Sequence, residues 1–228
     1  MTHTTIGDRI KRYEIVSKTS LLPNSYVVLR VDGRAFHTWT RGLKKPFDYV
    51  LMGAMVVTGE SVAKEMSGFK LGYHQSDEFS FVITDTDSYE TELWFGGEVQ
   101  KLCSITASLF TAYFNYEMGI EIGDKPAVFD CRAFNVPKDD VANVFIWRQQ
   151  DWERNSLQML ARSEFSQSEL HGKKCADIHE MLHRNDMNWC DLPDDAKNGT
   201  FITKDGRKIR SKLTYDEINN LLGIRTVI

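Results

Sequence analysis

The sequence predicts an α+β fold, in which an antiparallel sheet with a strand–helix–strand–strand–helix–strand order precedes a mainly helical extension. Short apolar runs flanked by polar or turn-forming residues predict four strands within the first 137 residues. Two longer segments between them carry apolar residues at three- and four-residue steps, which is typical of helices packed on a sheet. We assign residues 1–137 to this core, with a helix at its N-terminus, and residues 138–228 to the extension. The two parts are expected to pack as one unit.

The first third of the chain is expected to supply a helix, a strand and a second helix. Residues 8–17 form a short helix that is charged on one side, and residues 26–31 form the first strand. The second helix is expected to begin at Pro46 and to run to about Met66. Proline suits the first turn of a helix because the N–H group that it lacks would have no partner there.

The middle of the chain is expected to supply a hairpin, a long helix and a fourth strand. Residues 69–73 and 79–83 are strands whose connection is short enough for an antiparallel hairpin. Residues 92–116 carry the clearest helical periodicity in the chain. Residues 127–136 alternate between apolar and charged side chains, which predicts a half-buried strand.

This βαββαβ order is the split βαβ pattern of ferredoxin-like domains and of polymerase palms. In that topology the first strand and the central hairpin lie side by side in the sheet. Asp32 follows the first strand, and Asp77 lies in the connection of the hairpin. The two carboxylates are therefore expected to meet at one edge of the sheet.

The extension is expected to hold two helices, over residues 141–165 and 168–183, the second capped by Ser168. A basic segment follows, and its cations are Lys197, Lys204, Arg207, Lys208, Arg210 and Lys212, with Asp205 as the single acid among them. Such a segment is a solvated hairpin, a loose tail or an RNA contact, and the sequence does not choose between these. Whether residues 214–228 dock on the core also stays open.

The composition is that of an ordinary globular protein, with 42% hydrophobic and 26% charged residues. No apolar stretch approaches the ~20 residues that span a bilayer, and residues 1–14 lack the apolar region of a secretory signal. The four cysteines are widely spaced without a C-x-x-C pair, so we expect reduced thiols and a cytoplasmic protein. A net charge of −4 argues against a non-specific nucleic-acid coat, but it allows a local basic patch.

Asp32 and Asp77 are the candidate metal ligands. Two carboxylates from neighbouring strands can hold a pair of Mg²⁺ ions roughly 3.5–4 Å apart, as in enzymes of phosphoryl and nucleotidyl transfer. Gly33 has no Cβ, so its backbone can approach an ion closely and its carbonyl can complete the shell. Either segment alone would favour a solvated acidic turn, but together they favour a metal–nucleotide site.

The residues around these two acids favour a nucleotide as the ligand. The N–H groups of residues 34–37 can turn toward a triphosphate, as backbone groups do in anion-binding turns. Phe36 is expected to act through its backbone, and His37 is either a phosphate donor or a structural histidine. Lys45 precedes the proline at the expected helix start and can reach phosphates. Glu78 is either a metal ligand or a carboxylate that supports the ligands.

Several blocks of the sequence resemble one known family. Residues 30–37 read Arg-Val-Asp-Gly-Arg-Ala-Phe-His, and residues 73–82 read Tyr-His-Gln-Ser-Asp-Glu-Phe-Ser-Phe-Val. Together with Lys45 and Pro46, and with Trp-Arg-Gln-Gln-Asp at residues 147–151, they resemble the tRNA(His) guanylyltransferase superfamily, in the family's order. Weaker matches continue in residues 169–174, 188–189 and 197–199.

The resemblance implies a palm-like catalytic core that adds nucleotides to RNA in the 3′-to-5′ direction. The RNA 5′ end carries a triphosphate, or a monophosphate adenylylated with ATP, and the 3′-hydroxyl of the incoming nucleoside triphosphate attacks it. ATP and GTP or other nucleoside triphosphates are the implied substrates. Two Mg²⁺ ions are implied, held by Asp32, the Gly33 carbonyl and Asp77. Because the family generally forms tetramers, we expect a homo-oligomer.

The resemblance also implies roles for individual residues. The nucleotide-binding residues are Asp32, Gly33, Arg34, Ala35, Phe36, His37, Ser76 and Asp77. Lys45 matches a lysine that assists 5′ activation, and we add Glu78 to the catalytic residues beside Asp32 and Asp77. The expected tRNA contacts are Arg148, Arg154, Asn155, Lys197, Arg207, Lys208 and Arg210.

The sequence departs from the family pattern after Asp151. Eukaryotic guanylyltransferases continue with His-Ile-Asn-Asn-Leu-Tyr-Asn, whereas residues 153–159 read Glu-Arg-Asn-Ser-Leu-Gln-Met. This favours the guanylyltransferase-like branch, whose members rebuild 5′-truncated tRNAs with the opposite strand of the acceptor stem as template. The alternative is a true tRNA(His) guanylyltransferase that adds a single guanosine.

Three functions of other classes fit less well. Nucleotide cyclases share the palm topology, but the basic segment and the Arg148 block suit an RNA substrate better. A tRNA-binding protein without activity is disfavoured because both candidate metal carboxylates are present. His179 to His183 match H-E-x-x-H, the motif of zinc proteases, but no local motif supplies the third ligand that catalytic zinc needs.

Overall fold

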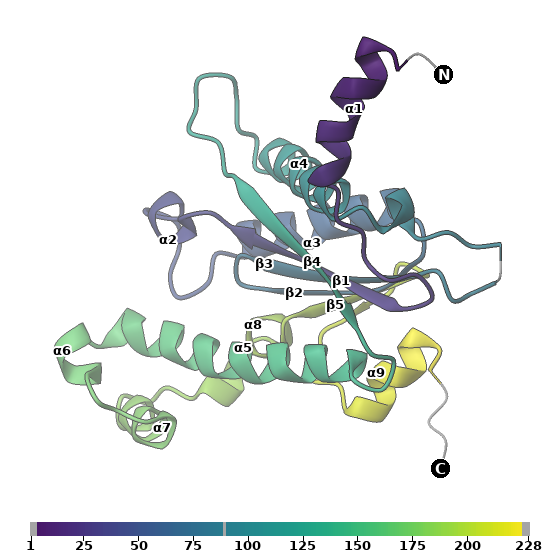
Figure 1. Ribbon diagram of the computed structural model, residues 1–228. Helices are drawn as coiled ribbons and strands as arrows, with labels where there is room; N and C mark the ends of the chain where they lie inside the picture. Colours follow the sequence, from purple (N-terminus) through teal and green to yellow (C-terminus); the bar gives the residue numbers. More distant parts are fainter. Residues whose placement is uncertain (1–3, 89, 225–228) are drawn as a thin grey trace.

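The protein is built around a six-stranded antiparallel sheet with helices on both faces (Figure 1). The computed structural model describes residues 4–88 and 90–224. The strand order is β4-β1-β3-β2-β5-β6. The strands are β1 Tyr26–Gly33, β2 Phe69–Gln75, β3 Glu78–Thr84, β4 Phe129–Val136, β5 Thr200–Thr203 and β6 Lys208–Ile209. The mixed helix and strand content and the antiparallel sheet are as predicted.

The helices follow the predicted order with some differences in detail. They are α1 Ile6–Val16, α2 Phe36–Trp39, α3 Tyr49–Glu65, α4 Val99–Glu117, α5 Val141–Glu164, α6 Gln167–Leu170, α7 Cys175–Arg184, α8 Asp194–Asn198 and α9 Tyr215–Leu222. Short 3₁₀ turns cover Trp94–Gly97 and Trp189–Asp191. The single-turn helix α2, between β1 and α3, was not predicted from the sequence.

Two hydrophobic cores sandwich the sheet, because its central strands are apolar on both sides. Val27, Leu29 and Val31 of β1 pack with side chains of α3 and α4 on one face. Tyr26 and Val28 face the other way, toward α5 and α9. The residues at the polar end of β1 continue this alternation, so the side chain of Asp32 emerges on the face that α5 covers.

Three predicted helix starts were wrong, and two of them are those of α3 and α6. The helix α3 begins after Asp48 and not at Pro46, because the Asp48 carboxylate accepts hydrogen bonds from the Val50 and Leu51 N–H groups, both at 3.0 Å. The expected helix over residues 168–183 is two helices, α6 and α7. Its N-cap is Ser166, whose capping box with Glu169 defines α6, and the chain breaks at Gly172, where φ is +74°.

The predicted helix over residues 92–116 begins later than expected. Two glycines with positive φ, Gly96 and Gly97, hold a 3₁₀ turn there, and α4 starts only at Val99. The other long helices have nearly the predicted bounds, and α5 ends at Glu164. No helix in the part of the chain that the structure describes is both long and apolar enough to cross a membrane.

The extension also contributes strands to the sheet. The strand β5 pairs with β2, with Phe201 opposite Tyr73, and β6 pairs with β5. The basic segment therefore forms a hairpin at the edge of the sheet, which was one of the open alternatives. Beyond it, α9 docks on the core through Ile218 and Leu222, both buried. The far half of α5 packs against α7 in a separate small cluster.

Candidate active site

The carboxyl end of β1 and the β2–β3 turn form an acidic edge of the sheet. The N–H of Gly33 donates to the carbonyl of Asp77 at 3.0 Å, which ties the end of β1 to the turn. In the strand register, Asp32 lies opposite Glu78 of β3 and opposite Asp130 of β4. The structure therefore brings Asp32 and Asp77 together, as the topology predicted. Asp130, which the sequence analysis did not single out, joins them.

The turn that carries Asp77 is stabilised by a hydrogen bond from a buried histidine. Ser76 has a φ of +51°, the left-handed conformation of a tight turn. His74 is 2% exposed, and its Nε2 lies 2.9 Å from the Ser76 carbonyl. Burial lowers the pKa of His74 to about 4, so the neutral ring donates this hydrogen bond at neutral pH. His74 was overlooked because a histidine within an apolar strand gives no signal of its own.

Gly33 is required by the packing beneath it. A Cβ at this position would lie 2.3 Å from the ring of Phe36. The Phe36 ring is buried against Phe129, with centroids 5.1 Å apart, and against Phe114 at 5.7 Å. The ring therefore belongs to the core, and the role expected for the Phe36 backbone stays a prediction.

The turn after Gly33 presents free backbone donors. Ala35 is in the left-handed conformation, with φ of 52°, and starts the single turn of α2. The N–H groups of Ala35, Phe36 and His37 have no hydrogen-bond acceptor among the described residues. Successive free N–H groups of this kind form an anion-binding concavity.

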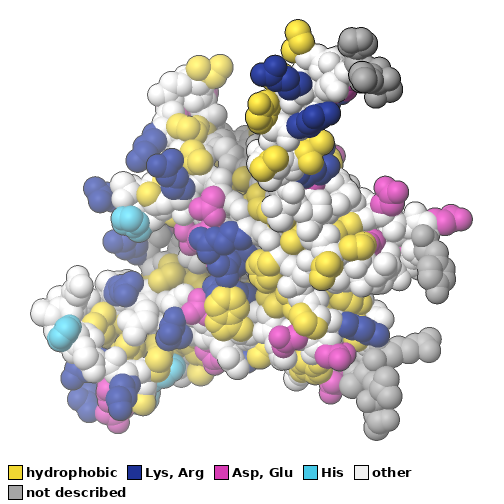
Figure 2. All heavy atoms as spheres, in the orientation of Figure 1, with side chains coloured by type: hydrophobic (Ala, Val, Ile, Leu, Met, Phe, Trp, Pro, Cys, Tyr) yellow, Lys and Arg dark blue, Asp and Glu magenta, His cyan; other side chains and the backbone are white. Residues whose placement is uncertain are grey.

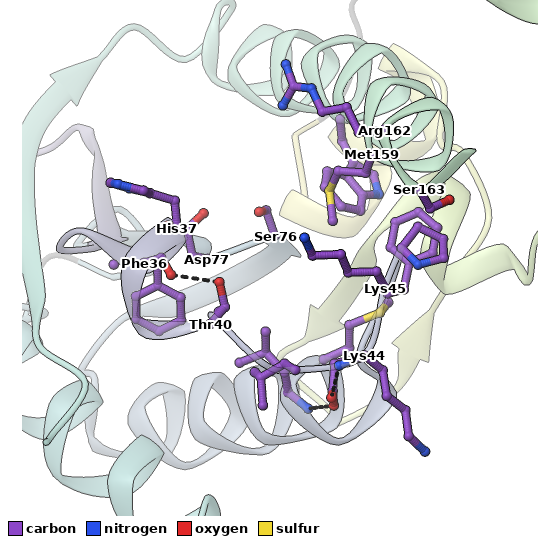
Figure 3. A pocket seen from close by; sticks show the side chains of 18 of the residues that line it. Phe36, His37, Thr40, Lys44, Lys45, Ser76, Asp77, Met159, Arg162 and Ser163 are labelled. Carbon is purple, nitrogen blue, oxygen red and sulfur yellow. Dashed lines mark hydrogen bonds between the residues drawn. The ribbon is translucent and has the colours of Figure 1, made fainter. Parts of the chain in front are cut away.

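A cavity of about 510 Å³ lies beside the acidic edge (Figure 3). It is enclosed by the turn after β1, the start of α3 and the second half of α5. The predicted residues that line it are Gly33, Ala35, Phe36, His37, Lys45, Ser76 and Asp77. Further lining residues that the sequence analysis missed are Thr40, Asp48, Trp152, Met159, Arg162 and Ser163. Asp32, Arg34 and Glu78 are not among the described residues that line it.

Three cationic or basic side chains surround this cavity without a carboxylate partner. Figure 3 shows the Lys45 side chain reaching toward Ser76 across the cavity, whereas Lys44 points away. Arg162 lines the opposite wall from α5, and His37 lies beside Asp77. Among residues 4–88 and 90–224, none of Lys45, Arg162 and His37 forms an ion pair. Unpaired cations around a concave surface favour a polyanionic ligand.

The acidic edge carries negative charge that the protein does not fully balance. Burial raises the pKa of Asp77, and the nearby charge of Asp32 raises it further. The nearest cation to Asp32 is Arg132, with Nη2 3.9 Å from Oδ2 and 56% of its side chain exposed. Two close carboxylates with a backbone carbonyl are an all-oxygen donor set, which suits Mg²⁺. The residues present therefore fit a divalent cation at this edge.

Glu78 is bound on its other side by two arginines. Its Oε1 lies 2.7 Å from Arg148 Nε, and its Oε2 lies 3.8 Å from Arg30 Nε. Burial raises the pKa of Glu78, and Arg148 and Arg30 oppose that shift. Of the two roles left open for Glu78, these contacts favour a carboxylate that supports the ligands.

The expected tRNA contacts on α5 form one network. Arg148 has only 7% of its side chain exposed, and its Nη2 pairs with Asp151 at 2.9 Å. Arg154 pairs with the same carboxylate at 2.6 Å, and Asn155 donates to it at 3.2 Å. Of these three side chains, Arg154 is the one that is mostly exposed to solvent, with 62% of its surface accessible.

The expected contacts in the basic segment lie apart from one another. Lys208 pairs with Glu60 of α3 at 2.8 Å, on one side of the sheet. Arg210 lies 3.8 Å from Asp195, and Arg207 pairs with Asp205 of its own hairpin at 2.7 Å. Lys197 donates to the carbonyl of Cys190 at 2.7 Å. These cations therefore do not form a single patch with α5.

The H-E-x-x-H segment has a structural role. Helix α7 buries Ile178 and Leu182 against α5, while the ring of His179 packs edge-on against Trp189, with centroids 6.1 Å apart. No group of three or more His, Cys, Asp or Glu side chains is arranged to hold a metal ion within the described parts of the chain. The zinc alternative therefore finds no third ligand.

Paired carboxylates at a sheet edge beside a cavity with free N–H groups and unpaired cations are the arrangement of enzymes of phosphoryl and nucleotidyl transfer. The family model described as tRNAHis guanylyltransferase (Thg1) matches residues 7–137, which is more than half of the chain. The chain therefore belongs to the tRNAHis guanylyltransferase family, and the predicted resemblance is confirmed.

Individual relatives agree with this assignment. The tRNA(His) guanylyltransferase of Schizosaccharomyces pombe is 33% identical over 190 residues, which are 76% of this chain and 70% of the relative. The solved structure of a bacterial tRNA(His) guanylyltransferase (Thg1)-like protein in complex with ATP is 40% identical, with a TM-score of 0.91 over 96% of this chain and 98% of that one. A structure with the same description in complex with GTP is 41% identical, with a TM-score of 0.77 over 89% and 88% of the two chains.

Proposed function

We propose that this protein adds nucleotides in the 3′-to-5′ direction to the 5′ end of tRNA, with Mg²⁺, and that it rebuilds 5′-truncated tRNAs on the opposite strand of the acceptor stem. The observation that carries the proposal is the cavity beside the acidic edge. Its free N–H groups and unpaired cations suit a triphosphate, and Asp77 lies on its wall. Because the similar Thg1-like structures were solved with ATP and with GTP, we infer that both nucleotides bind here.

The cavity residues would bind and orient the nucleotide. The N–H groups of residues 35–37 and the Ser76 hydroxyl donate to phosphate oxygens, while Lys45 and Arg162 offset the charge of the phosphates from opposite walls. In this role Lys45 assists the activation of the RNA 5′ end with ATP. Arg34 is exposed, but its N–H already donates to the Val128 carbonyl at 2.8 Å, so of the expected donors in residues 34–37 only the N–H groups of 35–37 are free for phosphates.

Asp32, Asp77 and the Gly33 carbonyl would hold the two Mg²⁺ ions. When bound there, these ions lower the pKa of the attacking hydroxyl and offset charge on the leaving pyrophosphate. Glu78 keeps its place through Arg148 and thereby fixes the end of β3 next to Asp32. In this proposal the β4-β1-β3-β2 part of the sheet is a polymerase palm, with residues 1–137 as the catalytic core and the extension packed on it as one unit.

Template-directed repair is favoured over addition of a single guanosine by two observations. The chain is 40% identical to the bacterial Thg1-like protein and 33% identical to the S. pombe guanylyltransferase. At the position of the eukaryotic histidine, Glu153 pairs with Lys212 at 2.6 Å, so a different contact occupies this part of α5. We further propose that the enzyme works in the cytoplasm, as a homotetramer.

The test uses a 5′-labelled tRNA that lacks its first nucleotide, incubated with Mg²⁺, ATP and each nucleoside triphosphate in turn. We expect the wild-type protein to add only the nucleotide complementary to the acceptor strand. Asp77→Ala is expected to abolish the addition, whereas Asp139→Ala, an exposed acid outside the site, is expected to keep it. Addition of guanosine whatever the opposing base would favour the single-guanosine alternative. No extension from either a monophosphate or a triphosphate end would refute the proposal.

A further inference from the structure

A large aromatic side chain lies exposed beside the acidic edge. Trp147, in the first half of α5, is 50% exposed. The guanidinium carbon of Arg148 lies 4.4 Å from its ring centroid, and that of Arg30 lies 5.6 Å away. Cations at these distances attract the π-system and hold the ring in place. Trp147 is therefore an ordered ring with much of its surface open to solvent.

The two arginines connect Trp147 to the reaction centre. Arg30 and Arg148 both pair with Glu78, which lies opposite Asp32 in the strand register. The nucleotide cavity is lined by residues from the second half of α5, whereas Trp147 lies in its first half. Trp147 is not among the described residues that line that cavity. The acidic edge thus contacts the cavity through Asp77 and is linked to the exposed ring through Glu78, Arg30 and Arg148.

The surroundings of the ring are polar and cationic. Arg132 of β4 has 56% of its side chain exposed and lies beside Asp32, and Arg154 on α5 is 62% exposed. Neighbouring positions on α5, Asn143 and Gln150, are polar and exposed. Figure 2 shows Lys and Arg side chains gathered next to a large apolar side chain at the centre of this face.

We propose that Trp147 is a platform on which a base at the 5′ end of the RNA substrate stacks, with Arg132 and Arg154 contacting the adjacent phosphates. The inference rests on the proposed function, because it requires an RNA end at this site. Aromatic rings bind bases of any sequence by stacking, and arginines bind phosphates without reading sequence. A base on Trp147 would bring the RNA 5′ end near the acidic edge, to which Arg30 and Arg148 link the ring through Glu78.

The test compares Trp147→Ala and Trp147→Phe with Tyr116→Ala, a control that removes an exposed aromatic ring, 80% exposed, from the end of α4. The probe is a tRNA without its first nucleotide, titrated at fixed salt and followed by fluorescence anisotropy. We expect Trp147→Ala to weaken RNA binding about tenfold or more, and Trp147→Phe, which keeps a ring, to stay within about threefold of wild type. ATP binding and the thermal unfolding midpoint are expected to change in none of the variants.

A second probe reports stacking directly. With 2-aminopurine as the 5′-terminal base, wild type and Trp147→Phe are expected to quench its fluorescence on binding more than Trp147→Ala does. Arg132→Gln is expected to lower the dependence of log affinity on log salt by about one unit, as for one lost phosphate contact.

The outcomes separate the platform from the proposed function. Equal RNA affinity and equal quenching for wild type and Trp147→Ala, in a protein that does add nucleotides, would overturn the platform alone. An equal loss in Tyr116→Ala would overturn it too. If Trp147→Ala weakens RNA binding as expected but the wild-type protein adds no nucleotide, the proposed reaction is overturned and the platform is supported.

Discussion

Removing the guanidinium of Arg148 is predicted to destabilise the fold much more than removing that of Arg154, an exposed arginine in the same helix. Arg148 pairs with Glu78 at 2.7 Å and with Asp151 at 2.9 Å. The Arg148 side chain is 7% exposed and that of Glu78 is 13% exposed. Arg148→Met keeps most of the aliphatic stem but leaves the buried Glu78 carboxylate with Arg30 alone, at 3.8 Å. Breaking a buried ion pair from one side costs about 3–5 kcal/mol of unfolding free energy.

The control is Arg154→Met, which removes an ion pair of similar length, 2.6 Å, from a side chain that is 62% exposed. We expect it to cost about 0–1 kcal/mol, because exposed pairs are screened by water. Both variants are compared with wild type by urea unfolding. Loss of ATP binding is not expected in Arg154→Met, since this residue does not line the cavity.

The pH dependence gives the reasoning a second check. Burial already raises the pKa of Glu78, and the loss of Arg148 would raise it further. As the pH falls, the folded variant therefore takes up a proton on Glu78 before the unfolded chain does, and the buried charge disappears. The difference in stability between wild type and Arg148→Met is expected to be larger near pH 7 than near pH 5.

Three results would refute this reasoning. The first is an Arg148→Met variant within about 1 kcal/mol of wild type, as for an exposed pair. The second is a loss that does not change with pH. The third is a double variant, Arg148→Met with Glu78→Gln, that recovers none of the lost stability, since Glu78→Gln removes the unpaired charge.

Three further predictions concern the cavity and the turn beside it. Burial holds the pKa of His74 at about 4, below its usual 6.5, so the unfolded chain binds a proton before the folded protein does as the pH falls. The unfolding free energy of the protein should therefore fall by up to about 3 kcal/mol as the pH falls from 6.5 to 4. His74→Gln should remove this part of the pH dependence in urea unfolding. Arg162→Met is expected to raise the KM for ATP about tenfold, as for one lost charge-assisted contact, while Lys44→Met, whose side chain points away, leaves it unchanged in steady-state assays. Gly33→Ala is expected to lower the thermal unfolding midpoint and the activity together, because its Cβ would meet the Phe36 ring at 2.3 Å; an unchanged midpoint in calorimetry would contradict this.

The sheet and its acidic edge could be predicted because their signals are local. Period-two alternation indicated which side chains of β4 share a face, a short apolar run indicated β1, and the element order brought Asp32 next to Asp77. The strand β5 was harder to predict, because four residues, Thr200–Thr203, lie within a segment dominated by cations. Its pairing with β2 depends on tertiary contacts that no local pattern reports.

The walls of the cavity could be predicted only in part. The residues contributed by the turn after β1 lie within the motif that also supplies the acidic edge, so the sequence indicated them. Arg162 and Trp152 come from the far part of α5, more than a hundred residues along the chain from Gly33. Their signal is that of an ordinary amphipathic helix, and only the packing of α5 across the sheet brings them to the nucleotide cavity.

The start of α3 shows how one local signal overrides another. Proline is compatible with a first helical turn, but Asp48 offers the unpaired N–H groups a carboxylate two residues later. The helix therefore begins after the better cap. This leaves Lys45 and Pro46 in the loop that lines the cavity, where Lys45 reaches toward Ser76 (Figure 3).

The most direct measurement changes the template and identifies the added nucleotide. Two tRNAs without their first nucleotide, identical except for cytidine or adenosine at the opposing position of the acceptor strand, are incubated with the protein, Mg²⁺ and all four nucleoside triphosphates, and the 5′ nucleotide of each product is identified by mass spectrometry. Template-directed 3′-to-5′ addition predicts guanosine on the first RNA and uridine on the second, with neither product formed by Asp77→Ala. Guanosine on both RNAs, or no product from either, would contradict it.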